Sequence, residues 1–157
     1  MKRVLSVLFA VLLLTSCSSE RREPEGNIRW IDVYYADTGD KIIDSEQRAI
    51  SVEDSITAAI TASVEQMQHK PIGDNLKPAI PEEIKLLGVK FDHGAVKISF
   101  SEEYANLQGF DKTVADYAIL MTLSNFWNVQ SVEILAGDRV VTPAFSQRKI
   151  VTEMPTR

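Results

Sequence analysis

Chemically reactive side chains are scarce in this sequence. The 157 residues include one cysteine and two histidines. A single cysteine cannot form an intramolecular disulfide, and the sequence has no Cys/His spacing typical of a zinc site. It also has no glycine-rich loop that could cradle a phosphate and no Ser/His/Asp order typical of a hydrolase. We therefore expect no catalytic residue, no metal and no cofactor.

Basic residues are outnumbered, because 17 lysines and arginines stand against 22 aspartates and glutamates. A formal charge of −5 makes the chain a poor partner for nucleic acid. Its 45% hydrophobic and 25% charged residues are typical of a globular protein of one ordinary domain. No internal repeat is visible. We expect one packed core and no nucleic-acid partner.

The N-terminal apolar run, residues 4–14, is too short to cross a membrane, since a spanning helix needs about 20 apolar residues. It follows Lys2 and Arg3 and leads to small residues just before Cys17. This order of basic, apolar and small residues is typical of an export signal. The sequence therefore predicts a signal peptide over residues 1–16.

The segment Leu14-Thr15-Ser16-Cys17 resembles the bacterial lipobox, in which a signal peptidase cuts before a cysteine that carries a diacylglyceryl thioether. A plain secretory cleavage site is the alternative, and it would leave this cysteine as an unpaired thiol. Two or three acyl chains give stable anchoring, because each buried methylene contributes about 0.8 kcal/mol. We predict lipidation of Cys17 and a location on the extracytoplasmic face of the cell membrane.

The expected organisation has four segments: signal peptide 1–16, lipidated cysteine and flexible tether 17–28, folded domain 29–141 and C-terminal tail 142–157. Residues 18–28 combine charge, proline and glycine with a single apolar side chain, so they cannot fold alone. As a coil they reach about 18 Å. Signal cleavage removes two basic residues and no acidic one, so the formal charge changes from −5 to −7. The lipids, rather than a basic patch, are expected to hold the domain at the membrane.

The first part of the domain alternates in hydrophobicity. Ile31, Val33 and Tyr35 share one face of a predicted strand over residues 29–35. Two short strands are expected next, at residues 41–44 and 48–50.

A helix follows these strands. Ser51 and Asp54 form a capping-box arrangement that predicts its start. Its apolar stripe consists of Ile56, Ala59, Ile60, Val64 and Met67. The helix must end before Lys70-Pro71, because the residue ahead of proline is disfavoured in a helix.

The second part of the domain contains two hairpins, at residues 85–101 and 129–141. Their turns are Asp92-His93-Gly94 and Gly137-Asp138. A second helix is expected between them, over residues 112–125. Hairpins separated by two helices predict an α/β fold, a two-layer sandwich whose mixed β-sheet is built from hairpins with two helices on one face.

Asp37-Thr38-Gly39 is the tripeptide that carries the catalytic carboxylate in aspartic peptidases, and Leu86-Leu87-Gly88 could serve as the downstream glycine segment of such an enzyme. That enzyme is all-β and dimeric, and a small residue follows each of its tripeptides. Here Asp40 and Lys41 follow instead, and the predicted helices contradict the fold. We interpret the tripeptide as a turn.

The remaining candidate ligands are few. His69 lies at a predicted helix end and His93 in a hairpin turn, where solvation is expected. Asp37, Asp40 and Asp44 lack the register and the distal glutamate of a calcium loop. We expect no specific metal site from either group.

Several short motifs occur in a fixed order: Ile80-Pro81 before the Leu86-Leu87 strand, Gly94, Ser99-Phe100-Ser101-Glu102, Leu123 to Phe126, Val129, Val132, Ile134 and Gly137. Together they resemble the GerMN domain, also called the sporulation and spore germination domain, over Ile31 to Val141. Two departures are Lys70-Pro71, where the family usually has Gly-Pro, and the single copy of the domain, since the namesake has two.

The resemblance implies a lipidated or membrane-anchored envelope protein that acts in spore formation or germination and is not an enzyme. It also implies a fold similar to ring-building modules of export assemblies, with the Asp-Thr-Gly position as a link after the first strand. We expect a non-catalytic interaction or scaffold module whose partners are other envelope proteins. The alternative, a ligand-binding or hydrolytic envelope lipoprotein, would require a pocket with convergent polar groups.

Trp127 is the candidate partner contact. The apolar stripe of the second helix is complete at Phe126, and the next strand is expected near Val129, so Trp127 lies in the connection. Large aromatic side chains are mostly buried, and Trp127 could cover the end of the core. Tryptophan is also enriched at the energetic centres of interfaces. The sequence leaves both interpretations open.

Overall fold

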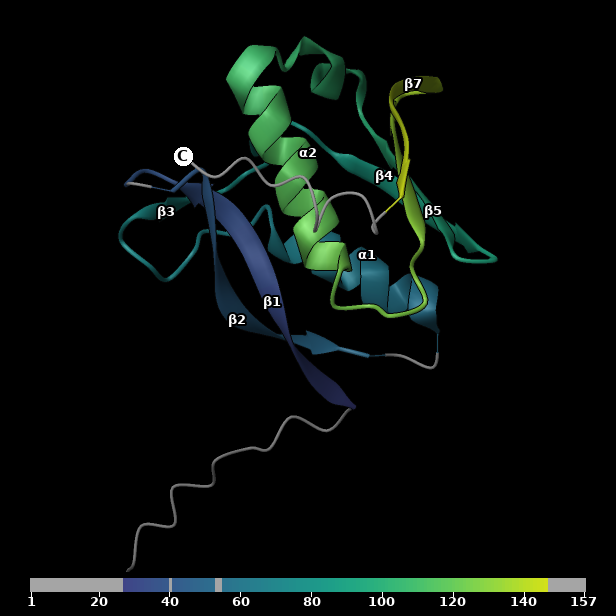
Figure 1. The fold of residues 1–157 in the computed structure, drawn as a ribbon, viewed down its shortest axis with the longest axis horizontal. Helices are drawn as coiled ribbons and strands as arrows, with labels where there is room; N and C mark the ends of the chain where they lie inside the picture. The colour runs from purple at the N-terminus through teal and green to yellow at the C-terminus, as the bar shows by residue number, and fades with distance from the viewer. Residues whose placement is uncertain (1–26, 40, 53–54, 147–157) are drawn as a thin grey trace, which may run out of the picture.

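The computed structural model describes residues 27–39, 41–52 and 55–146 (Figure 1). The predicted signal peptide, Cys17 and most of the tether lie outside these residues. The elements in chain order are β1 (Ile28–Asp37), β2 (Ile43–Ser51), α1 (Ile56–Gln66), β3 (Leu76–Lys77), β4 (Leu86–Asp92), β5 (Ala95–Phe100), the 3-10 helix η1 (Glu102–Asn106), α2 (Gly109–Leu123), β6 (Ser131–Ala136) and β7 (Arg139–Ser146).

The described strands form two sheets. One is antiparallel with the order β2-β1-β3, and the other has the order β4-β5-β6-β7. In the second sheet β5 and β6 run parallel, whereas the β4–β5 and β6–β7 pairs are antiparallel hairpins. The predicted α/β class, the mixed pairing and the two helices packed against strands are confirmed. The sequence pattern indicated one sheet, but the first hairpin forms its own.

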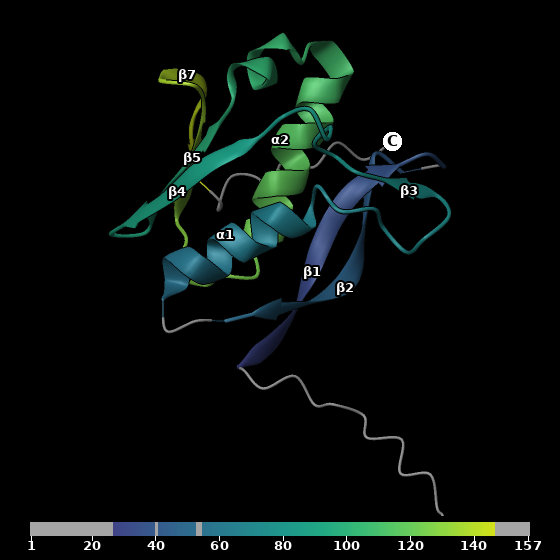
Figure 2. The same cartoon turned by 180° about the vertical axis from the view of Figure 1, so that it is seen from behind.

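The two helices lie between the sheets. Figure 1 shows α2 between β1 and the four-stranded sheet, and Figure 2 shows the same order from behind. Helix α2 packs mainly on β1, whereas α1 packs on β4, β2 and α2. Both helices therefore contribute to one hydrophobic core, which also receives side chains from both sheets.

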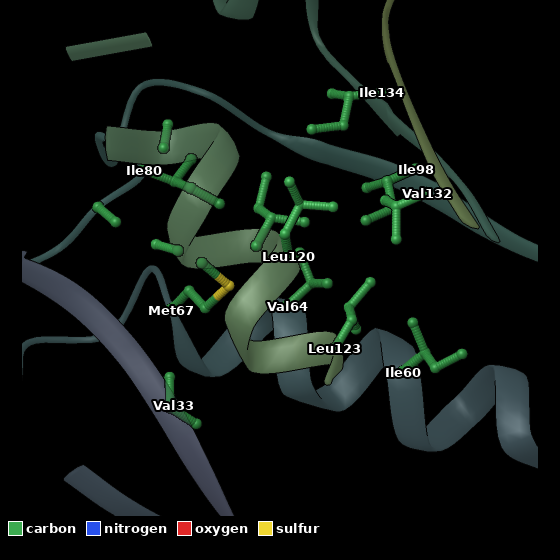
Figure 3. Close-up of a cluster of buried hydrophobic side chains, with 14 of the residues drawn as sticks. Val33, Ile60, Val64, Met67, Ile80, Ile98, Leu120, Leu123, Val132 and Ile134 are labelled. Carbon is green, nitrogen blue, oxygen red and sulfur yellow. The ribbon is translucent and has the colours of Figure 1, made fainter. Parts of the chain in front are cut away.

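Side chains from both helices and from both sheets meet in this core, as Figure 3 shows. Those with no exposed surface include Val33 of β1, Val64 of α1, Leu123 of α2, Ile98 of β5 and Val132 of β6. The predicted inward face of β1 is confirmed, since Ile31, Val33 and Tyr35 are all buried. Because β1 is held by this face, its outer face and its free edge remain available for other contacts.

The start of α1 differs from the prediction. Ser55, not Ser51, caps the helix, and its Oγ accepts a hydrogen bond from the N–H of Ala58 at 3.0 Å. Ser51 instead belongs to β2, where it pairs with Ile28. Strand pairing therefore outweighed the local capping pattern, because the long β1–β2 ladder extends through Ser51.

The hairpin between β4 and β5 is confirmed. Its turn residues His93 and Gly94 have φ angles of 46° and 87°, two successive left-handed conformations that are typical of a type I′ turn. A Cβ on Gly94 would lie 3.0 Å from the side chain of Gln130, so glycine is also required by the close packing of the next connection.

The domain extends beyond the predicted boundary at residue 141. Strand β7 continues to Ser146, because it pairs with the beginning of β6 through the register Ser131 to Ser146. Thr142, which was assigned to the tail, is buried. The predicted tail therefore contains the last residues of a strand.

Candidate functional site

The connection between α2 and β6, residues 124–130, is fastened to the beginning of β1. The side chain of Asn125 donates to the backbone O of Asp32 at 2.9 Å and accepts from its N–H at 3.2 Å. The Arg29 guanidinium donates to the backbone O of Asn125 at 2.9 Å. The Asn125 side chain thus satisfies the backbone N–H and C=O of Asp32 as a neighbouring strand would, although the two residues are 93 positions apart in the sequence.

The α2 helix covers the same edge of β1 one step further along. The backbone N–H of Tyr34 donates to Oγ1 of Thr122 at 3.0 Å. A free strand edge offers unpaired N–H and C=O groups to other chains. Side chains of α2 therefore satisfy part of an edge that β3, which pairs only with Ala36 and Asp37, leaves open.

Phe126 and Trp127 are neighbours with opposite environments. Phe126 is 1% exposed, and the Arg29 guanidinium lies 5.0 Å from the centre of its ring. Trp127 is 91% exposed. The interpretation of Trp127 as a lid on the core is therefore wrong, because Phe126 already fills that place. The interpretation of Trp127 as a partner contact stays a prediction.

Trp30 is the other tryptophan of the chain, which has two in total. It lies on β1 beside Arg29 and is 65% exposed. It alternates with the buried residues Ile31 and Val33, so it belongs to the outer face of this strand. Both tryptophans therefore stand in solvent on segments that Arg29 and Asn125 tie together.

A shallow pocket of about 300 Å³ opens at this end of the domain. Its lining is Asn27, Arg29, Val52, Ser55, Ile56, Ala59 and Phe126. Arg29 is the charged member of this lining, and the other side chains are apolar or small and polar. Among the described residues, the lining contains no carboxylate and no histidine that could act as a general acid or base.

The Asp37 carboxylate is occupied by its own turn. It accepts hydrogen bonds from the N–H of Gly39 at 3.0 Å and from that of Lys41 at 2.9 Å. Residues 86–88, the supposed second peptidase segment, lie in β4 of the other sheet. The interpretation of Asp37-Thr38-Gly39 as a turn is confirmed.

A wider pocket of about 630 Å³ lies beside this turn. Phe110, which is 63% exposed, lines it together with proline and aliphatic side chains. The carboxylates of Asp37, Glu82 and Asp111 also line it. Thr38 and Lys77 line it as well, but the Thr38 hydroxyl donates to the backbone O of Asn75 at 3.0 Å, and no cysteine or histidine is among the described lining residues.

One cluster of titratable side chains lies away from both pockets. Asp116 accepts hydrogen bonds from Tyr104 at 2.8 Å, from Thr142 at 3.0 Å and from Lys112 at 2.6 Å. Burial raises the pKa of Tyr104, and the negative charge of Asp116 raises it further. Because the phenol stays protonated at neutral pH and the carboxylate is fully engaged, this cluster joins η1, α2 and β7 rather than providing a catalytic base.

The histidines are solvated, as expected. His69 is exposed, and the His93 side chain is 94% exposed beside Asp92. Within the described residues, no group of three or more histidines, cysteines, aspartates or glutamates is placed to hold a metal ion. Nor does this part of the chain contain a helix that is long and apolar enough to span a membrane.

Sequence reasoning missed the residues that build this site. Asn125 and Thr122 were counted only as part of the second helix, and Arg29 only as the first residue of a strand. Their contacts join segments about 90 residues apart in the chain. Trp30 and Trp127 could have indicated this surface from the sequence, because both lie outside the predicted apolar stripes.

Comparison with known proteins agrees with this fold. The sequence matches the family Germane, described as sporulation and spore germination, over residues 32–142. No curated protein matches the chain. Among solved structures, the first GerMN domain of the sporulation protein GerM from Bacillus subtilis is similar, with a TM-score of 0.56 and 15% identity over 76% of this chain and 98% of that one.

Two further structures are similar to the chain. The tandem GerMN domains of the same Bacillus subtilis protein have a TM-score of 0.55 and 20% identity, over 71% of this chain and 40% of theirs. A protein from Clostridium perfringens described as a lipoprotein candidate has a TM-score of 0.50 and 17% identity, over 78% of this chain and 89% of that one. At these identities the structural likeness shows the fold alone. The family match covers more than half of the sequence, and the chain therefore belongs to the Germane family and contains a GerMN domain.

Proposed function

We propose that this chain is an envelope lipoprotein, anchored through Cys17 on the extracytoplasmic face of the cell membrane. Its GerMN domain acts as a non-catalytic interaction module in sporulation or spore germination, with other envelope proteins as partners. Trp127 is the proposed contact residue. The observation that carries this proposal is the 91% exposure of Trp127 on a connection that is hydrogen-bonded to β1. Tryptophan is a residue type in which interfaces concentrate their energy.

The carboxylates that could have supported chemistry favour a module over an enzyme. Asp37 closes its own turn, and Asp116 is neutralised by Lys112 while it accepts from two hydroxyl groups. The predicted lipobox supports the anchor independently of the domain. The description of the Clostridium perfringens protein as a lipoprotein candidate is compatible with such an anchor.

Intact mass measurement of the membrane fraction tests the anchor. We expect a chain that begins at Cys17 and carries acyl groups, and we expect Cys17→Ser to leave the chain uncut or to release it from the membrane. A native chain that is soluble and begins at another residue would contradict the anchor.

A crosslinked pull-down of the tagged lipoprotein from its own cells tests the interaction role. We expect envelope proteins to be captured during sporulation or germination and to be absent from a parallel pull-down of Cys17→Ser. Equal capture by the anchored and unanchored chains would argue against a membrane-bound module.

A further inference from the structure

We propose that the end of the domain that carries Trp30 and Trp127 docks directly onto the lipid surface of the membrane that holds the anchor. This inference rests on the proposed lipidation of Cys17. It assigns the exposed ring of Trp127 to the lipid surface, so that envelope proteins would meet another face of the domain. It assigns a role to both tryptophans, whereas the anchor alone assigns a role to neither.

The length of chain before the domain places this end close to the lipids. Ten residues, 18–27, separate Cys17 from the start of β1. As the coil that their composition predicts, they span about 17 Å on average. A domain of this size has a radius of gyration of about 14 Å, so the tether is shorter than the domain is wide. The beginning of β1 is therefore the part of the domain nearest the headgroups.

The two tryptophans lie at that end. Figures 1 and 2 both show the start of β1 and the connection after α2 at the same end of the molecule. The hydrogen bonds of Arg29 and Asn125 hold these two segments together. Because the segments are already fixed, docking would cost little ordering of the protein.

The chemistry of the exposed side chains fits the boundary between headgroups and acyl chains. Tryptophan has an apolar body and one N–H donor, and it is enriched at the depth where a membrane meets water. Ile28, which is 37% exposed, adds apolar surface beside Trp30. Arg29 and Asp32 have opposite charges, and the acidic residues Glu53 and Asp54 follow β2 in the sequence, so contact by the aromatic rings rather than attraction to anionic lipid would drive docking.

The anchor makes a small surface sufficient. A tether converts docking into an intramolecular step with an effective concentration in the range of about 1 mM or more. A patch that binds free vesicles poorly can then remain docked. The orientation of the domain on the membrane, and with it the side that partner proteins meet, would be set by these two rings.

The test uses the lipidated full-length chain in vesicles of phosphatidylethanolamine and phosphatidylglycerol, prepared with or without brominated acyl chains. The intrinsic fluorescence reports this surface alone, because the chain has no tryptophan other than Trp30 and Trp127. We expect the brominated chains to quench the emission and the vesicles to shift it to shorter wavelength. Since attraction to anionic lipid does not drive docking, added salt should not weaken the quenching.

A matched control moves the reporter to the other end of α2. In the variant Trp30→Phe, Trp127→Phe, Phe110→Trp, the only tryptophan stands in the first turn of a helix that is about 22 Å long. Phe110 is exposed like the two tryptophans, so the domain should still fold, which its melting temperature checks. We expect the emission of this variant to be quenched much less than that of the native chain.

Flotation of the vesicles separates the two proposals. A native chain that floats but is not quenched would overturn docking and leave the anchor intact, whereas a chain that does not float would overturn both. Equal quenching of the position-110 reporter would overturn docking, because the domain would then have no preferred end. Loss of a cellular protein crosslink in Trp127→Ala, with no lipid quenching of the native chain, would assign the surface to a protein partner and overturn docking.

Discussion

The carboxylates of Asp37 and Asp116 each accept several hydrogen bonds. The partners of Asp37 are close to it in the sequence, whereas some partners of Asp116 are far from it. Asp37 bonds to backbone groups two and four residues away and closes a turn near the surface. Asp116 joins side chains from three elements that are up to 26 residues away. The first arrangement requires only its own segment, whereas the second exists only after the domain has packed. We expect the two carboxylates to differ sharply in how much stability they carry.

Replacing Asp116 should have the largest effect. Asp116→Ala leaves the Tyr104 hydroxyl without its acceptor and the half-buried Lys112 ammonium without its counter-charge, with Thr142 as the remaining acceptor of Lys112. Buried donors that lose a partner cost about 1–3 kcal/mol, so we expect a loss of about 2–3 kcal/mol in the free energy of unfolding. Urea denaturation measures it. A loss no larger than that of Asp37→Ala would remove the distinction between the two carboxylates.

Alkaline pH should weaken the cluster around Asp116 next. Burial raises the pKa of Tyr104 above its ordinary value of 10.0, so the folded state keeps a proton that the unfolded state releases. The stability from this group is complete below pH 10.0 and falls as the pH rises above it, by up to about 1.4 kcal/mol per pH unit. The Tyr104 ring stacks on that of Phe100 with the ring centres 4.8 Å apart, and Tyr104→Phe should keep this stack and lose less stability per pH unit. Equal slopes of the free energy of unfolding against pH in the native chain and in Tyr104→Phe would show that Tyr104 does not cause the alkaline loss of stability.

Asn125 and Trp127 extend the comparison to two near neighbours. Asn125→Ala removes both bonds to the backbone of Asp32 and should cost about 1 kcal/mol. Trp127→Ala removes a ring that is 91% exposed and should change the free energy of unfolding by no more than about 0.5 kcal/mol. Thermal melting of the two variants side by side is sufficient. A costly Trp127→Ala would show that the ring packs on the domain.

The smallest effect is expected at Asp37. Asp37→Asn keeps one acceptor oxygen for its turn, and the expected change in the free energy of unfolding is no more than about 0.5 kcal/mol. Function in cells should be unchanged as well. Peptide cleavage that is inhibited by pepstatin and is abolished by this substitution would contradict both the turn assignment and the non-catalytic role.

Local features of the domain could be predicted from the sequence. Alternation placed Ile31, Val33 and Tyr35 on the buried face of β1. The His93-Gly94 pair specified the turn of the β4–β5 hairpin. The turn at Asp37 was also recognisable. In each case the signal and the structure lie within a few residues, so side-chain periodicity and backbone preference decide the outcome before any packing.

Only the tertiary structure decided which elements meet. The first hairpin formed its own sheet, Ser51 joined β2 rather than capping α1, and β7 continued to Ser146. No fixed spacing in the sequence identifies the contacts of Asn125 with Asp32. The same holds for the contacts of Asp116 with Tyr104 and Thr142. Strand edges and buried polar groups accept any partner of suitable geometry, and that partner is chosen by the packing of the whole core. For the same reason the sequence specified an aromatic side chain at position 127, but the packing of Phe126 beneath Arg29 placed it in solvent.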